Sequence, residues 1–441
     1  MPITRVVAQG IGPFDRLDLD LSDGRGEAHP GPHILAGVNG CGKSTALRAI
    51  AWILAGHTQN SGFPIDAWKH FLTGHPISFA SVVFKQRESP PYSYAKTGEQ
   101  TFRPAVNDAL GAVLPPVPPP LQRLTPQTRV PSAAAYAASR SLQYLRTPDV
   151  NKVRRDHSEG ALAFESTVEN EAVQAWLVGL FSKAAIAEKR GLSTGAYERS
   201  LNRLQDALQR IYGEDVQLDV ELDPVVQPRV RIRGQMLNLS QVPDGIRTIV
   251  GWLADFMMRQ ELVPPETTER VGEVLLIDEI DAHLHPRWQR QVLPALRDAL
   301  PGVQIIITTH SPFVISSCRG ARVHVLTLDE HGRASAKPPV DAPFGQSVNA
   351  TLMDIFGVES RFDLETEKDL DEWNELKRKE TVGRLSGAER TRLKGLTGNL
   401  EERSEELRSI VAAIPKIPRA VINSLLQGSR ATPKTRRVAK R

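Results

Sequence analysis

The nine residues from Gly37 to Thr45 read GVNGCGKST and fit the pattern G-x-x-x-x-G-K-[ST]. The residues before them, HILAG, predict a short buried strand, and the residues after them, TALRAIAWILAG, carry apolar side chains at helical spacing. Further along the chain, strand and helix patterns continue to alternate, which favours a parallel sheet with crossover helices. No other stretch restricts the possible folds of this chain as strongly.

The composition of this turn suits phosphate binding. Glycines let backbone N–H groups turn inward around a phosphate, and the N-terminus of the next helix adds the positive end of its dipole. The motif predicts that ATP contacts Gly37, Asn39, Gly40, Cys41, Gly42, Lys43, Ser44 and Thr45. Within it, we expect Lys43 to reach the β- and γ-phosphates and Ser44 to ligate Mg²⁺. A chance match in a glycine-rich turn is the alternative, and the strand and helix on either side argue against it.

Residues 274–288 read VLLIDEIDAHLHPRW. They begin with a second apolar run, VLLI, which an acidic pair follows directly. We expect VLLI to form a strand beside the first, ending at Asp278, because ligands of open α/β sheets bind at the carboxyl ends of the strands. Asp278 is predicted to hold Mg²⁺ through water, and Glu279 to polarise the attacking water as a general base. Two adjacent carboxylates at such a strand end are costly unless a cation or a reaction uses them.

Two histidines follow these carboxylates in the sequence, and a third follows the next apolar strand. His283 and His285 could suggest zinc, but no third ligand has a familiar spacing, so a loop position is favoured. The stretch ITTHSP ends the next apolar strand, and we expect His310 within it to bind the γ-phosphate and act as a switch. A satisfied structural histidine is the alternative for His310.

Together, GVNGCGKST, VLLIDEIDAHLHPRWQ and IIITTHSPFVIS resemble the ABC-type P-loop ATPases of the RecF, SMC and overcoming-lysogenization-defect (OLD) group. More narrowly, they resemble bacterial ATPases with the motifs D-E-x-x-x-x-L-H-P and T-T-H-S-P. Relatives of these occur in phage-defence modules, including the Septu ATPase that works beside an HNH nuclease. The resemblance implies an α/β ATPase head with a parallel core sheet, an antiparallel β subdomain, a helical insertion and a C-terminal helical extension.

The same resemblance carries expectations about function. It implies a Mg²⁺-dependent ATPase that forms a homodimer, or a higher oligomer, with ATP sandwiched between two heads, and whose slow hydrolysis serves as a switch. We expect a regulatory or sensor subunit of an anti-phage defence system that controls a separate effector nuclease. A housekeeping ATPase of DNA repair or recombination, of RecF or SMC type, is the alternative.

A signature motif should complete the ATP site of the partner head. The segment LSQVPDGIRT (residues 239–248) stands where this motif belongs, although the family usually shows L-S-x-G. The resemblance implies that Gly245 presents its N–H to a γ-phosphate, with Ser240 as the candidate for the signature serine. LSGAE at residues 385–389 resembles the transporter signature but follows His310. We interpret it as a helix start with a capping box.

The resemblance also implies a glutamine that senses Mg²⁺. Gln143 is preferred for this role, and Gln86 is the alternative. Nearby Arg140 is either a phosphate or partner contact or a surface arginine.

Residues 364–411 alternate acidic and basic side chains around regularly spaced leucines, which predicts two helices. They form either a solvated cap or a partner-binding arm. OLD nucleases carry a C-terminal TOPRIM domain, but the only D-x-D of the C-terminal region, Asp369 and Asp371, has no strand before it, so we expect no nuclease in this chain. The last twelve residues hold six basic side chains and no acidic one, which makes contact with DNA or RNA one use of the tail.

The composition of the chain indicates only where in the cell the protein resides. The formal net charge of +4, two cysteines and the absence of an apolar run of membrane length predict a cytoplasmic protein with no membrane contact. We divide the chain into an N-terminal ATPase lobe with the P-loop (1–90), a Pro-rich loop (91–131), a helical and hairpin insertion (132–235), a C-terminal ATPase lobe (236–358), a helical extension (359–426) and a basic tail (427–441).

Overall fold

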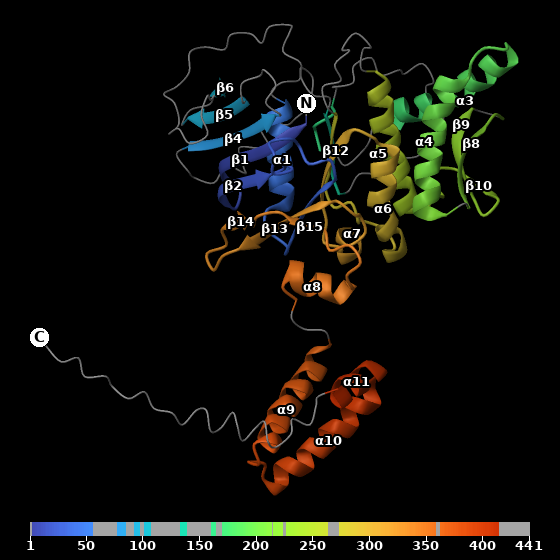
Figure 1. Cartoon of the computed structure of the whole chain (residues 1–441). Helices are drawn as coiled ribbons and strands as arrows, with labels where there is room; N and C mark the ends of the chain where they lie inside the picture. The colour runs from blue at the N-terminus through green and yellow to red at the C-terminus, as the bar shows by residue number, and fades with distance from the viewer. Residues whose placement is uncertain are drawn as a thin grey trace, which may run out of the picture. The chain divides into compact units, whose positions relative to one another are not determined.

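The computed structural model describes most of the chain (Figure 1). The described residues are 2–55, 77–84, 92–97, 101–106, 133–138, 160–164, 170–213, 215–223, 226–262, 273–358 and 362–413. The contacts divide the chain into two compact units, Met1–Gly357 and Val358–Arg441. Within the described residues, no helix has the length and apolar character needed to cross a membrane.

A central sheet organises the first unit. Its strands follow the order β14 (Ala334–Ala336), β13 (Arg322–Leu328), β3 (His33–Gly37), β12 (Val303–Thr308), β11 (Glu273–Ile277) and β7 (Ala133–Tyr136), with β15 (Val340–Asp341) also paired to β13. The five strands from β13 to β7 pair in parallel, whereas β14 and β15 are antiparallel to β13. The parallel core sheet is confirmed.

One detail of this sheet contradicts the expectation from the sequence. We expected the strand that ends before Asp278 to lie beside β3, but β12 pairs with both β3 and β11 and separates them. The apolar runs of β11 and β12 suit any interior position of a parallel sheet, so their composition does not determine their order. The strand that carries the TTHS segment therefore lies between the glycine-rich turn and the acidic pair.

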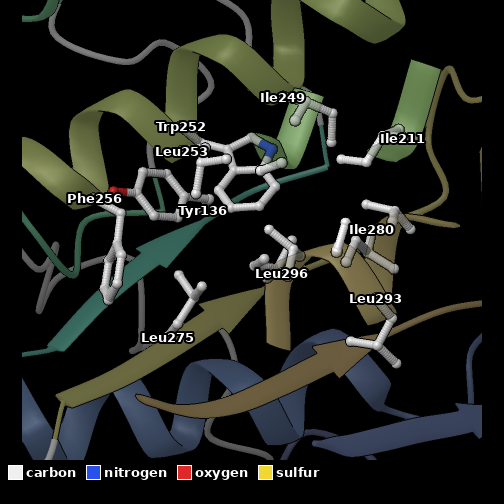
Figure 2. Close-up of a cluster of buried hydrophobic side chains, with 14 of the residues drawn as sticks. Tyr136, Ile211, Ile249, Trp252, Leu253, Phe256, Leu275, Ile280, Leu293 and Leu296 are labelled. Carbon is white, nitrogen blue, oxygen red and sulfur yellow. The ribbon is translucent and has the colours of Figure 1, made fainter. Parts of the chain in front are cut away.

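Alternate residues of the strands enter two separate cores. Leu275 and Ile277 of β11 join a cluster with α5 (Asp244–Glu261) and α6 (Pro286–Ala299). Figure 2 shows this cluster, in which Trp252 of α5 packs beside Tyr136 of β7 with ring centroids 5.9 Å apart. Val274 and Leu276 face the other way, toward α1 (Lys43–Ala55). Burial on both faces explains why β11 is apolar throughout rather than alternating.

An antiparallel sheet covers the outer side of α1 (Figure 1). Its order is β2 (Phe14–Asp20), β1 (Ile3–Ile11), β4 (Ile77–Phe84), β5 (Tyr92–Thr97) and β6 (Thr101–Val106). The predicted antiparallel subdomain is therefore present, but it extends into residues 91–131, which we had assigned wholly to a Pro-rich loop. Pro104 fits in β6 because β6 is an edge strand. The proline run at 114–120 lies outside the described residues.

The remaining elements of this unit are helices and a small sheet. Besides α1, the helices among its described residues are α3 (Asn170–Lys189), α4 (Gly195–Tyr212), α5, α6, α7 (Pro312–Ile315) and α8 (Val348–Phe356). β8 (Val216–Glu221), β9 (Gln227–Ile232) and β10 (Gln235–Leu237) form a small antiparallel sheet. The segment 132–235 is not wholly an insertion, since its first strand, β7, belongs to the central sheet.

Residues 362–413 of the second unit form three helices where we predicted two: α9 (Leu364–Thr381), α10 (Gly387–Arg403) and α11 (Glu405–Ala413). Ser404 has an extended backbone and its hydroxyl accepts from Leu407 N, so it ends one helix and begins the next. Trp373 and Leu400 lie in a core of this unit. The predicted capping box of Ser386 and Glu389 is confirmed. The basic tail, 427–441, lies outside the described residues.

Candidate functional site

The glycine-rich turn connects β3 to α1 at the carboxyl edge of the central sheet. Gly42 has φ 90°, and a Cβ atom there would lie 2.5 Å from the ring of Phe14, so only glycine fits. Val38, Asn39 and Gly40 are exposed at the crown of the turn, while Cys41 is buried. The turn therefore exposes the backbone of residues 38–40, while Cys41 and Gly42 pack against the interior.

Lys43, the first residue of α1, folds back onto this turn. Its ammonium group donates 2.9 Å hydrogen bonds to the carbonyl oxygens of Gly37 and Val38. Burial lowers the pKa of Lys43, although the nearby Glu279 and Asp278 carboxylates oppose this shift. The two carbonyl oxygens and a third acceptor, the Cys41 thiol at 3.8 Å, are uncharged, so they orient the ammonium group without cancelling its charge, which favours an anion beside it.

The two predicted magnesium ligands lie together. The Ser44 hydroxyl donates to Asp278 Oδ1 at 2.9 Å. Hydroxyl and carboxylate oxygens are ligands that suit Mg²⁺, and the ion usually keeps several of its waters. The pair therefore fits Mg²⁺ with Ser44 as a direct ligand and with Asp278 beside it, close enough to hold a water of the ion.

Glu279 and His310 lie beside these residues. Glu279 is half-buried and has a left-handed backbone, with φ 47°. Burial, followed by the charge of Lys43, lowers the pKa of His310, and the carboxylates of Asp281, Glu279 and Asp278 oppose this. His310 is thus a neutral imidazole at neutral pH. The structure brings the predicted base and the predicted switch residue to one edge of the sheet.

The signature-like segment lies against the loop that follows Glu279. Gly245 is buried, and a Cβ atom on it would lie 2.7 Å from the His283 carbonyl oxygen. The Tyr212 hydroxyl donates to the Gly245 carbonyl at 2.8 Å. Ser240 is exposed and donates to Asn238 Oδ1 at 2.5 Å. Close packing within one head therefore requires glycine at 245, and its contact with a phosphate of a partner head stays a prediction.

The two histidines after the acidic pair, His283 and His285, lie in the loop before α6. His285 Nδ1 accepts a 3.2 Å hydrogen bond from Arg287 N and caps α6. His283 is exposed and has φ 62°. Among the described residues, no group of three or more His, Cys, Asp or Glu side chains is arranged to hold a metal ion.

Three further candidates cannot be placed at the site. Gln143, Gln86 and Arg140 lie outside the described residues. Their roles as Mg²⁺ sensor and phosphate contact stay predictions.

Sequence reasoning overlooked Thr308, the last residue of β12. Its hydroxyl donates to Asp278 Oδ1 at 2.6 Å and accepts from Glu279 N at 2.7 Å. The available signal was its position: the carboxyl ends of neighbouring parallel strands meet at the same edge, so a hydroxyl ending β12 should meet the residues ending β11.

Comparison with known proteins places this geometry in context. The family described as "AAA domain, putative AbiEii toxin, Type IV TA system" matches residues 33–316. The chain is 24% identical over 151 residues to the retron Vc95 probable ATPase of Vibrio cholerae serotype O1 biovar El Tor, covering 34% of this chain and 29% of that protein. It is 38% identical over 114 residues to the Septu protein PtuA of Bacillus thuringiensis, covering 24% and 29% respectively.

The chain thus spans less than a third of the length of these two relatives. Among solved structures, the SMC head bound to the C-winged helix domain of ScpA matches with a TM-score of 0.47 and 11% identity, over 77% of this chain and 98% of that chain.

Proposed function

Because this chain belongs to the family described as "AAA domain, putative AbiEii toxin, Type IV TA system", we propose that it binds ATP and hydrolyses it to ADP and phosphate. The observation that supports this most strongly is the hydrogen bond between Ser44 and Asp278, with Lys43 and Glu279 next to it. A phosphate-binding turn, a magnesium-binding pair and a candidate base occur within one small region. No single one of these features would be enough to support ATP hydrolysis.

The residues suggest how the reaction proceeds. Lys43 and the backbone amides of the turn bind the phosphates, and Ser44 and Asp278 would hold Mg²⁺, which would neutralise phosphate charge. Glu279 accepts a proton from a water molecule as the water oxygen bonds to the γ-phosphorus. The bond from that phosphorus to the bridging oxygen of ADP breaks. His310, which is neutral, donates a hydrogen bond to the γ-phosphate and so distinguishes the ATP-bound state from the ADP-bound state.

Phosphate release in the presence of ATP and Mg²⁺ tests this activity. We expect the purified wild type to release phosphate and Lys43→Ala to lose the activity. Lys394→Ala removes an exposed lysine side chain from α10 in the other unit and serves as the matched control. An inactive wild type would refute the proposal, and equal rates in wild type and Lys43→Ala would assign the activity to a contaminant.

We further propose that two copies of the chain associate around ATP. The support is the position of the signature-like segment, whose helix α5 begins at Asp244 beside the loop that follows Glu279. In such a dimer, the N-terminus of α5 of each head faces the γ-phosphate bound by the other. Light scattering should find the dimer mass for Glu279→Gln with ATP and the monomer mass with ADP. A monomer under both conditions would exclude ATP-dependent dimerisation.

We propose a regulatory or sensor role in anti-phage defence, with a separate effector nuclease as partner. The support is the similarity to the Septu protein and to the retron ATPase. A cytoplasmic location suits this role and suits the two free, buried thiols, Cys41 and Cys318.

Affinity capture of tagged Glu279→Gln from its native host with ATP, followed by mass spectrometry, tests the partner. Recovery of a nuclease encoded nearby is the expected result. Recovery of repair or replication proteins would instead favour the housekeeping alternative. Recovery of the chain alone would overturn the two-component proposal while leaving the ATPase intact.

A further inference from the structure

Thr308 makes three hydrogen bonds to the segment that follows β11. Its hydroxyl donates to Asp278 Oδ1 at 2.6 Å and accepts from Glu279 N at 2.7 Å, and its carbonyl accepts from Ile280 N at 3.1 Å. Thr308 is fully buried. One side chain at the end of β12 therefore contacts both the magnesium ligand and the backbone of the candidate base.

The backbone of Glu279 needs such support. Its φ of 47° lies in the left-handed region, which non-glycine residues rarely adopt because the Cβ atom approaches the following carbonyl oxygen. The backbone conformation determines the direction in which the Glu279 side chain leaves the loop. A released N–H at this position would let the residue relax to a right-handed or extended conformation and turn its carboxylate elsewhere.

The hydroxyl group is suited to this double contact. It carries one proton, which it donates to Asp278, and its lone pairs remain to accept from the Glu279 N–H. Valine has nearly the same shape as threonine but can make neither hydrogen bond. Serine can make both.

A second hydroxyl fixes the other end of the loop. Thr309 donates to Asp281 Oδ1 and accepts from Ser311 N at 2.9 Å, and its own N–H donates to the Leu35 carbonyl of β3 at 3.3 Å. Glu279 thus lies in a segment held from both sides by Thr308, which ends β12, and by Thr309, which follows it. These two residues bond to the segment after β11 on one side and to β3 on the other.

We propose that Thr308 is a positioning residue for the hydrolytic step: its hydroxyl fixes the backbone of Glu279 and the carboxylate of Asp278 in one arrangement. The proposal rests on the proposed ATPase function. Thr308 acts through Glu279, so removal of its hydroxyl should slow hydrolysis at saturating Mg²⁺ and ATP without weakening ATP binding.

The test compares Thr308→Val with Thr308→Ser in steady-state hydrolysis. We expect Thr308→Val to lower kcat by about 10- to 100-fold, the usual range for supporting residues of a metal site, with KM changed by less than about threefold. Thr308→Ser should retain at least about a third of the wild-type kcat, because it keeps the hydroxyl. Thr351→Val, which removes another fully buried hydroxyl in α8, is the control and should keep the wild-type kcat.

A double-mutant comparison separates positioning from general damage. In single-turnover measurements on Glu279→Gln at saturating Mg²⁺, where the bond from Thr308 to Asp278 no longer limits metal binding, adding Thr308→Val should change the rate by less than about threefold, because the base through which Thr308 acts on hydrolysis is already absent. If the full effect of Thr308→Val persists in that background, or if Thr308→Ser fails to rescue kcat, Thr308 is merely structural. If Thr308→Val keeps the wild-type kcat, the positioning role is refuted while the ATPase stands. An inactive wild type would refute both.

Discussion

The Ser44 hydroxyl and Asp278 Oδ1 form a 2.9 Å hydrogen bond that joins residues 234 positions apart in the chain. Ser44 lies in the first turn of α1, and Asp278 immediately follows β11. The strand before α1, β3, and the strand before Asp278, β11, lie on opposite sides of β12 in the sheet order, so the bond spans the site. Its oxygens are the pair that we assign to Mg²⁺.

Replacing Ser44 should therefore weaken the response to magnesium more than the response to nucleotide. For Ser44→Ala we expect the Mg²⁺ concentration at half-maximal hydrolysis to rise about 10- to 100-fold, because one oxygen ligand is lost. Ser317→Ala, two residues after the end of α7, removes a hydroxyl that donates to the Val314 carbonyl at 2.7 Å, and it should behave as wild type. A Mg²⁺ titration of phosphate release measures both, and an unchanged midpoint in Ser44→Ala would contradict the assignment.

A second prediction concerns the packing of α5. In Gly245→Ala the new methyl group would meet the His283 carbonyl at 2.7 Å, so we expect a loss of about 1–3 kcal/mol in the free energy of unfolding, typical of overpacking. Gly179→Ala places a methyl group inside α3 with no atom within 4 Å. It should stabilise the protein by about 0.5–1 kcal/mol through helix propensity. Urea unfolding measures both, and equal stability of the two variants would exclude a close approach at Gly245.

A third prediction concerns acid stability. His33 Nδ1 and His324 Nε2 lie 3.1 Å apart, and both rings are fully buried. Burial lowers the pKa of His33 well below its usual value and that of His324 to about 4. Both side chains are therefore neutral in the folded state and take up protons more readily when unfolded. Their contribution to stability is complete above pH 6.5 and is lost as pH falls toward 4.

The free energy of unfolding should consequently fall between pH 7 and pH 5, with each histidine contributing up to about 1.4 kcal/mol per pH unit. His324→Gln keeps a hydrogen-bonding side chain but removes one titrating group, so its pH slope should be smaller. His331→Gln, at an exposed position, should keep the wild-type slope. If His324→Gln and wild type lose the same free energy over this range, the buried pair is not responsible.

Sequence reasoning identified Lys43, Ser44, Asp278, Glu279 and His310, and the structure places them at one edge of the central sheet. Motifs of this kind are local, and each motif directly followed or preceded a strong strand pattern. The side chains meet because the carboxyl ends of parallel strands share an edge. What such motifs do not contain is the order of strands in the sheet, which explains the unexpected position of β12.

Other features depend on contacts between distant segments. The packing requirement at Gly245 comes from the His283 carbonyl, and the bonds of Thr308 come from the loop after β11. Neither partner can be recognised from the residues next to it. The division of residues 364–411 into three helices depends on Ser404, a single polar residue in a charged stretch.

The central claim is that Glu279 is the base of an ATP-hydrolysing site, and Glu279→Gln tests it most directly. Glutamine has nearly the same shape but cannot accept the proton, so kcat should fall by about 10²- to 10⁴-fold. Equilibrium binding of ATP should stay within about threefold of wild type, since ATP is held by the glycine-rich turn and Lys43. Hydrolysis by Glu279→Gln at the wild-type rate, with ATP bound equally well, would contradict the account.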